Sequence, residues 1–138
     1  MNRYPISVHK EKDHYWSSCP DIPEAHSAGD TIEELLENAV EGITLAMSIY
    51  VDRGVAIPAP GIHGVGQHVV TLPVAVGAKA ILWNEMCAQG MRIADLARTL
   101  ELSHTPASRL VDFEHKSKIE QIEAALAALG RQLQISAV

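Results

Sequence analysis

The polar side chains between residues 17 and 35 are the first candidates for a reactive or metal-binding site in this sequence. The stretch reads SSCPDIPEAHSAGDTIEEL and combines a thiol, an imidazole and five carboxylates: Cys19, His26, Asp21, Glu24, Asp30, Glu33 and Glu34. Thiolate, imidazole and carboxylate groups bind metals and transfer protons in hydrolysis. A turn followed by a capped helix has the same composition. The first interpretation predicts an enzyme and the second a structural segment.

Three of these acids are explained by the start of a long helix. Apolar residues recur at spacings of three and four over residues 32–50, which predicts one amphipathic helix. Thr31 and Glu34 form a capping-box pattern before it, and Gly54 is a helix stop. Carboxylates in this first turn also complement the positive end of the helix dipole. The acids that this helix explains are Asp30, Glu33 and Glu34.

Three further polar residues have no such role. Asp21, Glu24 and His26 lie on a segment that contains Pro20 and Pro23, which predicts an exposed loop. We expect these three side chains to contact a partner and not to turn over a substrate.

The sequence contains no pattern that predicts a metal or cofactor site. Cys19 and Cys87 are the only cysteines and lack the CxxC spacing of zinc sites. His63 and His68 lie five residues apart in a Pro- and Gly-rich stretch without a neighbouring carboxylate or thiol. We therefore expect free thiols, no metal and no cofactor.

The charge of the chain is unevenly distributed. Of the 138 residues, 11 are basic and 17 acidic, a net charge of −6. Residues 1–60 contain four basic and ten acidic residues, whereas residues 61–138 contain seven of each. An acidic half repels nucleic acid and attracts a basic protein. A solvated acidic surface that only keeps the protein in solution is the alternative.

The chain shows no targeting or membrane segment. Its apolar runs, such as VAVGA and AALAAL, are far shorter than the roughly 20 residues of a membrane span. The N-terminus, MNRYPISVHKEKD, lacks the apolar core of a signal peptide. We expect a cytoplasmic protein.

The first half of the sequence predicts a small α+β unit. Alternating apolar residues predict a strand at 4–10, the polar turn EKDH predicts a hairpin to a second strand at 14–19, and a short third strand is expected near 25–27. After the helix, the Pro- and Gly-rich residues 55–68 predict a loop, and VVTLP (69–73) a last strand. We expect one domain at 1–72, with the helix packed on an antiparallel sheet.

The second half predicts an all-α domain at 73–138. A helix follows Pro73 and stops at Gly90, and further helices are expected at 92–100, 104–113 and 118–130. The last residues, QLQISAV, alternate in polarity and predict a short C-terminal strand. Such a strand has no partner in a helical domain and is a candidate for pairing across a dimer.

Residues 91–130 resemble the helix-turn-helix of the phage-repressor type. Leu96 and Ala97 match the packed positions of its first helix, Leu102 the turn, Ser103 the cap of the second helix, and Leu110 its buried position. Such a pair presents the start of its second helix to the major groove of DNA. A helical packing unit that binds no DNA is the alternative, since this half of the chain is electrically neutral.

The DNA-binding interpretation names seven residues. Arg109 is suited to a bidentate contact with guanine or to a phosphate contact. The others are polar residues at the start of the second helix and basic residues that flank the helices. The complete set is His104, Thr105, Ser108, Arg109, Arg92, Lys116 and Lys118.

Nearly the whole chain resembles the HicB antitoxin family. The most specific part is residues 4–45, which begin YPISVHKEKDHYWSSCPDIPEAHSAGDTIEELLENAVEGI. The later stretch VVTLPVAVGAKAILWNEM is also similar. The resemblance implies a partial RNase H-like sheet that neutralises a small basic RNA-cleaving toxin of the HicA type. It also implies repression of the toxin–antitoxin operon through operator DNA, and dimers or tetramers.

Glu33, Glu37 and Glu41 form an acidic ridge on the predicted helix. They recur every four residues without a Lys or Arg at pairing distance, so their mutual repulsion disfavours the helix. We expect this acidic ridge, or the loop that holds Asp21 and Glu24, to face the toxin. The alternative is a solvated face that contacts nothing.

The resemblance to RNase H does not extend to catalysis. That chemistry needs carboxylates that converge on two metal ions, one of them in the middle of the first strand. The predicted first strand, YPISVH, contains no acid. We therefore expect no enzyme activity. The runner-up function is a free-standing repressor whose N-terminal domain senses a small ligand.

Overall fold

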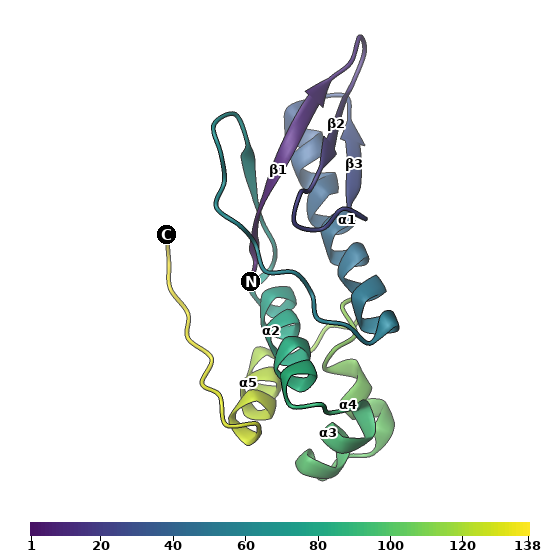
Figure 1. Ribbon diagram of the computed structural model, residues 1–138, viewed down its shortest axis with the longest axis vertical. Coiled ribbons are helices and arrows are strands. Elements are labelled where there is room, and N and C mark those ends of the chain that lie inside the picture. The colour runs from purple at the N-terminus through teal and green to yellow at the C-terminus, as the bar shows by residue number, and fades with distance from the viewer.

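The computed structural model describes residues 1–138 and shows an antiparallel sheet of four strands together with five helices. The sheet and α1 form one end of an elongated molecule, and α2 to α5 form the other (Figure 1). The elements are β1 (Arg3–Lys10), β2 (Tyr15–Ser18), β3 (His26–Gly29), α1 (Ile32–Arg53), β4 (His68–Thr71), α2 (Val74–Ala88), α3 (Ile93–Leu100), α4 (His104–Arg109) and α5 (Ile119–Ala128). The predicted mixture of helices with an antiparallel sheet is confirmed.

The strands lie in the order β3-β2-β1-β4. β1 and β2 form the predicted hairpin, in which Ser7 pairs with Ser18 and Lys10 with Tyr15. β4 returns after the long helix to pair with the first half of β1. The third strand is also present, shifted by about a residue from the predicted range. All four predicted strands of the first half are thus confirmed.

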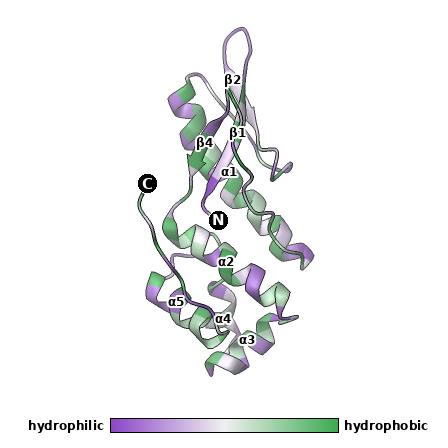
Figure 2. Cartoon of the chain, turned by 60° about the vertical axis from the view of Figure 1, so that its left-hand side comes forward, coloured by the Kyte–Doolittle hydropathy of each residue, from purple (hydrophilic) through white to green (hydrophobic).

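The long helix α1 covers one face of this sheet. Thr31 caps its N-terminus through one bond of the predicted capping box, from the Glu34 N–H to Thr31 Oγ1 at 3.1 Å, and Gly54 ends it with a left-handed φ of 69°. Apolar and polar residues alternate along α1 (Figure 2), as burial of one helix face requires. Gly42 allows a close approach to the sheet, because a Cβ there would lie 2.5 Å from Ser27 Oγ in β3.

The loop at 55–67 is attached to α2 by two side chains. The Trp83 indole N–H donates to the Val55 carbonyl at 2.8 Å. The Asn84 amide accepts from the Ile57 N–H at 2.8 Å and donates to the Ile57 carbonyl at 2.9 Å. This amide clamp satisfies both backbone groups of a buried residue and connects the end of α1 to α2.

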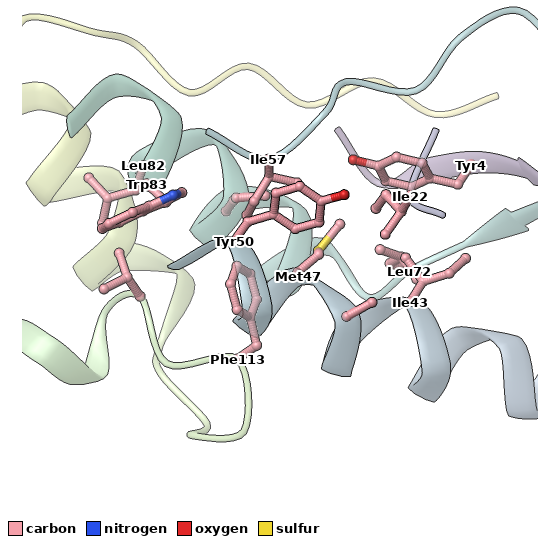
Figure 3. Close-up of a cluster of buried hydrophobic side chains, with 14 of the residues drawn as sticks. Tyr4, Ile22, Ile43, Met47, Tyr50, Ile57, Leu72, Leu82, Trp83 and Phe113 are labelled. Carbon is pink, nitrogen blue, oxygen red and sulfur yellow. The ribbon is translucent and has the colours of Figure 1, made fainter. Parts of the chain in front are cut away.

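One hydrophobic core runs through both halves of the chain. Met47 and Tyr50 of α1, Trp83 of α2 and Phe113 lie in the same cluster (Figure 3). Side chains from the sheet unit and from the helical half therefore bury one another. None of the helices combines the length and the apolar character needed to cross a lipid bilayer.

The single chain differs from two predictions in the second half. The helix predicted at 104–113 ends at Arg109, because the N–H groups of Leu110, Val111 and Asp112 bond to carbonyls three residues earlier and turn the chain. This turn brings both Val111 and Phe113 into the core.

The predicted C-terminal strand is the second difference, since it does not form within a single chain. Residues 131–138 form no strand, since a strand needs a neighbour for its backbone groups and none lies beside them. The segment instead runs from α5 back past α2 toward the sheet (Figure 1).

Candidate functional site

Two acids of the loop between β2 and β3 have intramolecular partners. Asp21 Oδ2 accepts a hydrogen bond from the Gly61 N–H at 3.0 Å and so anchors the loop at 55–67. Glu24 accepts from the Tyr50 hydroxyl and, at 3.3 Å, from Arg53 near the end of α1. The interpretation that these two acids lack a structural role is therefore wrong. No local pattern indicates these contacts, because the partners lie 40, 26 and 29 residues away in the sequence.

The contact between Glu24 and Tyr50 shifts both ionisation equilibria. The Tyr50 hydroxyl, then the backbone N–H of Glu24 and then Arg53 hold the pKa of the Glu24 carboxyl below its usual value. Burial, reinforced by the Glu24 carboxylate, raises the pKa of Tyr50 to about 12. At neutral pH the pair is thus a neutral phenol that donates to a carboxylate, an arrangement that supports structure and leaves no free general base.

The acidic ridge has the exposure that its predicted role requires. Glu33, Glu37 and Glu41 are all exposed on α1, and none forms an ion pair. His26 is also exposed, and its carbonyl lies near Gly42 in the middle of α1.

The six predicted partner-binding residues do not form a single site. Glu24 contacts Tyr50, which is 17 residues and therefore about 25 Å along α1 from Glu33. Asp21 and Glu24 each accept a hydrogen bond from another part of the chain, whereas the acids of the acidic ridge form no ion pair and lie elsewhere on the surface.

The polar stretch at 17–35 contains no reactive cluster. Nowhere in the chain do three His, Cys, Asp or Glu side chains gather in a way that could hold a metal ion. The Cys19 thiol is buried and donates to the Pro5 carbonyl at 3.7 Å, and burial raises its pKa. A thiol with a raised pKa is a poor nucleophile at neutral pH.

In the second half, α3 and α4 pack closely across a short connection. Leu96, Ala97 and Leu110 are buried, as predicted. Leu102 was expected to fill the turn but is 42% exposed, and Ser103 precedes α4 without accepting a capping bond through its side chain. The prediction for Ser103 is confirmed in position, since it is the N-cap residue of α4, whereas Leu102 does not fill the turn because the connection at 101–103 faces solvent.

The predicted DNA-binding residues lie on an accessible surface. Six of the seven are exposed: Arg92, His104, Thr105, Arg109, Lys116 and Lys118. Ser108 is partly buried, and its hydroxyl donates to the Thr105 carbonyl at 2.9 Å, which leaves it less free for other contacts. Arg92 stands before α3, where its N–H donates to the Asp95 carboxylate at 2.9 Å.

One important residue of this region was missed in the sequence. Lys79 of α2 is 2% exposed, and its ammonium group donates to the carbonyls of Arg109, Asp112 and His115. Burial lowers the pKa of Lys79, and the nearby Asp112 carboxylate opposes that shift. The available signal was a lone cation within the apolar run VAVGAKAILW.

Comparison with known proteins settles the family. Residues 3–81 match the family described as "HicB_like antitoxin of bacterial toxin-antitoxin system". The chain belongs to the HicB-like antitoxin family. The resemblance seen in residues 4–45 is thereby confirmed, and it identifies the acidic sheet–helix unit as part of the region that defines this antitoxin.

Relatives of this HicB-like antitoxin share nearly its full length. A protein named "Antitoxin HicB" from Pseudomonas fluorescens is 44% identical over 99% of this chain and 94% of its own. A protein of the same name from Escherichia coli is 29% identical over 96% of this chain and 97% of its own. A solved structure, "HicA3 and HicB3 toxin-antitoxin complex", overlaps 44% of this chain and 70% of its own, at 27% identity and a TM-score of 0.40.

Proposed function

We propose that this HicB-like antitoxin neutralises a small basic RNA-cleaving toxin of the HicA type through the unit formed by its sheet and α1. The observation that carries the proposal is charge. Residues 1–60 hold the whole net charge of −6, and the acidic ridge has no cationic partner within the chain. Unpaired carboxylates on a folded surface attract a basic protein and accelerate its association.

The toxin contacts the acidic ridge first. Glu33, Glu37 and Glu41 are free to form ion pairs, and His26 is exposed nearby. Asp21 and Glu24 take part less directly, since each already accepts a hydrogen bond from its own chain.

The second part of the proposal is repression of the toxin–antitoxin operon by a helix-turn-helix formed by α3 and α4. The close packing of two short helices supports it, as does the exposure of Arg109 and of the first residues of α4. Arg109 reads a guanine or a phosphate, whereas Arg92, Lys116 and Lys118 contact phosphates.

The third part is self-association as a dimer or tetramer. A neutral DNA-binding half gains affinity when two copies bind two half-sites. The C-terminal segment offers a means, because residues 132–138 take part in no backbone hydrogen bond and Ile135 is 71% exposed. Pairing of this segment with the same segment of a second copy would give these backbone groups partners and cover Ile135.

Co-expression with the proposed toxin, the small basic protein encoded next to this chain in the same operon, tests the antitoxin function. We expect the wild-type chain to relieve the growth arrest that this protein causes. A free-standing ligand-sensing repressor would bind its promoter without restoring growth, so failure to restore growth would reject the proposed target.

Footprinting on its own promoter tests repression, with Arg109→Ala expected to weaken the footprint. An unchanged footprint would show that α4 does not read the DNA.

A further inference from the structure

The ammonium group of Lys79 is bound entirely by backbone carbonyls. Its Nζ lies 3.0 Å from the Arg109 carbonyl oxygen, 2.7 Å from that of Asp112 and 2.5 Å from that of His115. An ammonium group has three N–H donors, so these three bonds use its full capacity. No carboxylate forms an ion pair with it.

The three carbonyls belong to a segment with little regular structure of its own. α4 ends at Arg109, and the last carbonyls of a helix have no partner within it. The chain from Leu110 to His115 consists of turns, and the Ser117 hydroxyl donates to the Arg109 carbonyl at 3.3 Å. Side-chain donors, above all Lys79 from α2, therefore hold residues 109–117 in place together with the burial of Val111 and Phe113.

We propose that Lys79 is a positioning residue for operator binding. Its ammonium group holds the carbonyl of Arg109 and the carbonyl immediately before Lys116, and so fixes the exposed side chains of Arg109, Lys116 and Lys118 relative to one another. This inference rests on the proposed function, in which α4 and the turn after it contact DNA. Rigid spacing of several cations is what allows them to meet successive phosphates together.

The salt dependence of DNA binding distinguishes positioning from a general structural role. The logarithm of the observed affinity falls linearly with the logarithm of the salt concentration. The steepness of this line, the salt slope, is proportional to the number of phosphates contacted. A variant that is merely less folded has fewer active molecules but the same contacts in each. A variant with a misplaced 109–118 segment makes fewer phosphate contacts, so its salt slope becomes smaller.

The test compares the full-length wild type with Lys79→Met, which keeps the aliphatic stem and removes the donors. Lys12→Met is the matched control, since it removes the same charge from an exposed position in the hairpin. Binding to the promoter fragment of the operon is titrated at several salt concentrations. We expect Lys79→Met to lower affinity at least about tenfold and to reduce the salt slope by about 1 to 3 per half-site, at about 0.9 per phosphate contact. Lys12→Met should change neither quantity.

A second variant covers the case in which Lys79→Met does not fold. Ser117→Ala removes one weaker donor from the Arg109 carbonyl and should reduce the slope in the same direction by a smaller amount. Hydrogen exchange of the free chains should show lost protection confined to residues 110–117 in each variant.

Three results would overturn the assignment of Lys79. The first is unchanged affinity and slope in folded Lys79→Met, and the second is a loss of affinity with an unchanged slope. The third, if Lys79→Met does not fold, is an unchanged slope in Ser117→Ala. Absence of promoter binding by the wild type would refute the proposed repressor function, and this role of Lys79 with it.

Discussion

Glu37 lies at the centre of the acidic ridge, and its replacement should affect stability and toxin binding in opposite directions. Glu33 and Glu41 lie four residues to either side, all three are exposed, and no cation pairs with them. Like charges at this spacing destabilise a helix by about 0.2–0.5 kcal/mol per pair. Glu37→Gln removes two such pairs, so the free energy of unfolding should rise by about 0.4–1 kcal/mol. For a domain of this size the melting temperature should increase by about 1–4 °C.

The same substitution should weaken the complex with the toxin. An exposed ion pair contributes about 0.2–1 kcal/mol, so the dissociation constant at low salt should increase by about 1.5- to 5-fold. Calorimetric melting and titration with purified toxin, at about 20 mM and about 1 M salt, measure both effects, and both should shrink as salt screens the charges. Glu123→Gln on α5 is the control, because it makes the same change in net charge far from α1.

Three outcomes would contradict this reasoning. A lower melting temperature for Glu37→Gln would show that Glu37 makes a favourable contact whose loss outweighs the relief of repulsion along the acidic ridge. An unchanged dissociation constant and salt dependence would show that the toxin does not contact the ridge. Equal weakening by Glu123→Gln would indicate a long-range effect of net charge in place of a local contact.

Three further substitutions test contacts within the fold. Asn84→Ala should lower the free energy of unfolding by about 2–4 kcal/mol in urea titrations, because two backbone groups of the loop at 55–67 lose their partner; Asn84→Asp, which keeps the acceptor, should cost less. Tyr50→Phe should raise the pKa of Glu24 in an NMR titration. Because a depressed carboxyl pKa stabilises the fold above the unfolded pKa and this gain is lost as pH falls through the folded pKa, wild type should lose more stability on acidification than the variant. Gly42→Ala should destabilise by about 1–2 kcal/mol through its clash with the Ser27 hydroxyl, and the added Ser27→Ala should recover most of that loss.

The elements that formed as predicted are those with local causes. The spacing of apolar residues, the Thr31 cap and Gly54 predicted α1 with both of its ends. Alternation of polarity predicted β1, and the polar turn after it predicted β2 as its hairpin partner. These patterns are readable because each depends on residues only a few positions apart. The family resemblance was recognisable for the same reason, since it lies in the contiguous residues 4–45.

The predictions that failed depend on residues far apart in the chain. The alternation of QLQISAV favours a strand, yet a strand needs a neighbour and this chain supplies none. The helical pattern after Arg109 was overridden by turns that bury Val111 and Phe113 together. After Arg109, local preference was too weak to oppose tertiary packing, whereas at the C-terminus no strand was available to pair with.

The stretch from Ser17 to Leu35 shows both kinds of information. Local sequence alone assigned Asp30, Glu33 and Glu34 to the start of a helix, because capping and the helix dipole act within one turn. Asp21 and Glu24 acquired their roles only in the folded chain, from Gly61 and Tyr50. Lys79 belongs to the same category, as three carbonyls 30 to 36 residues away converge on its ammonium group. Hydrogen bonds between distant residues exist only once folding has brought donor and acceptor together, and no spacing in the sequence encodes that distance.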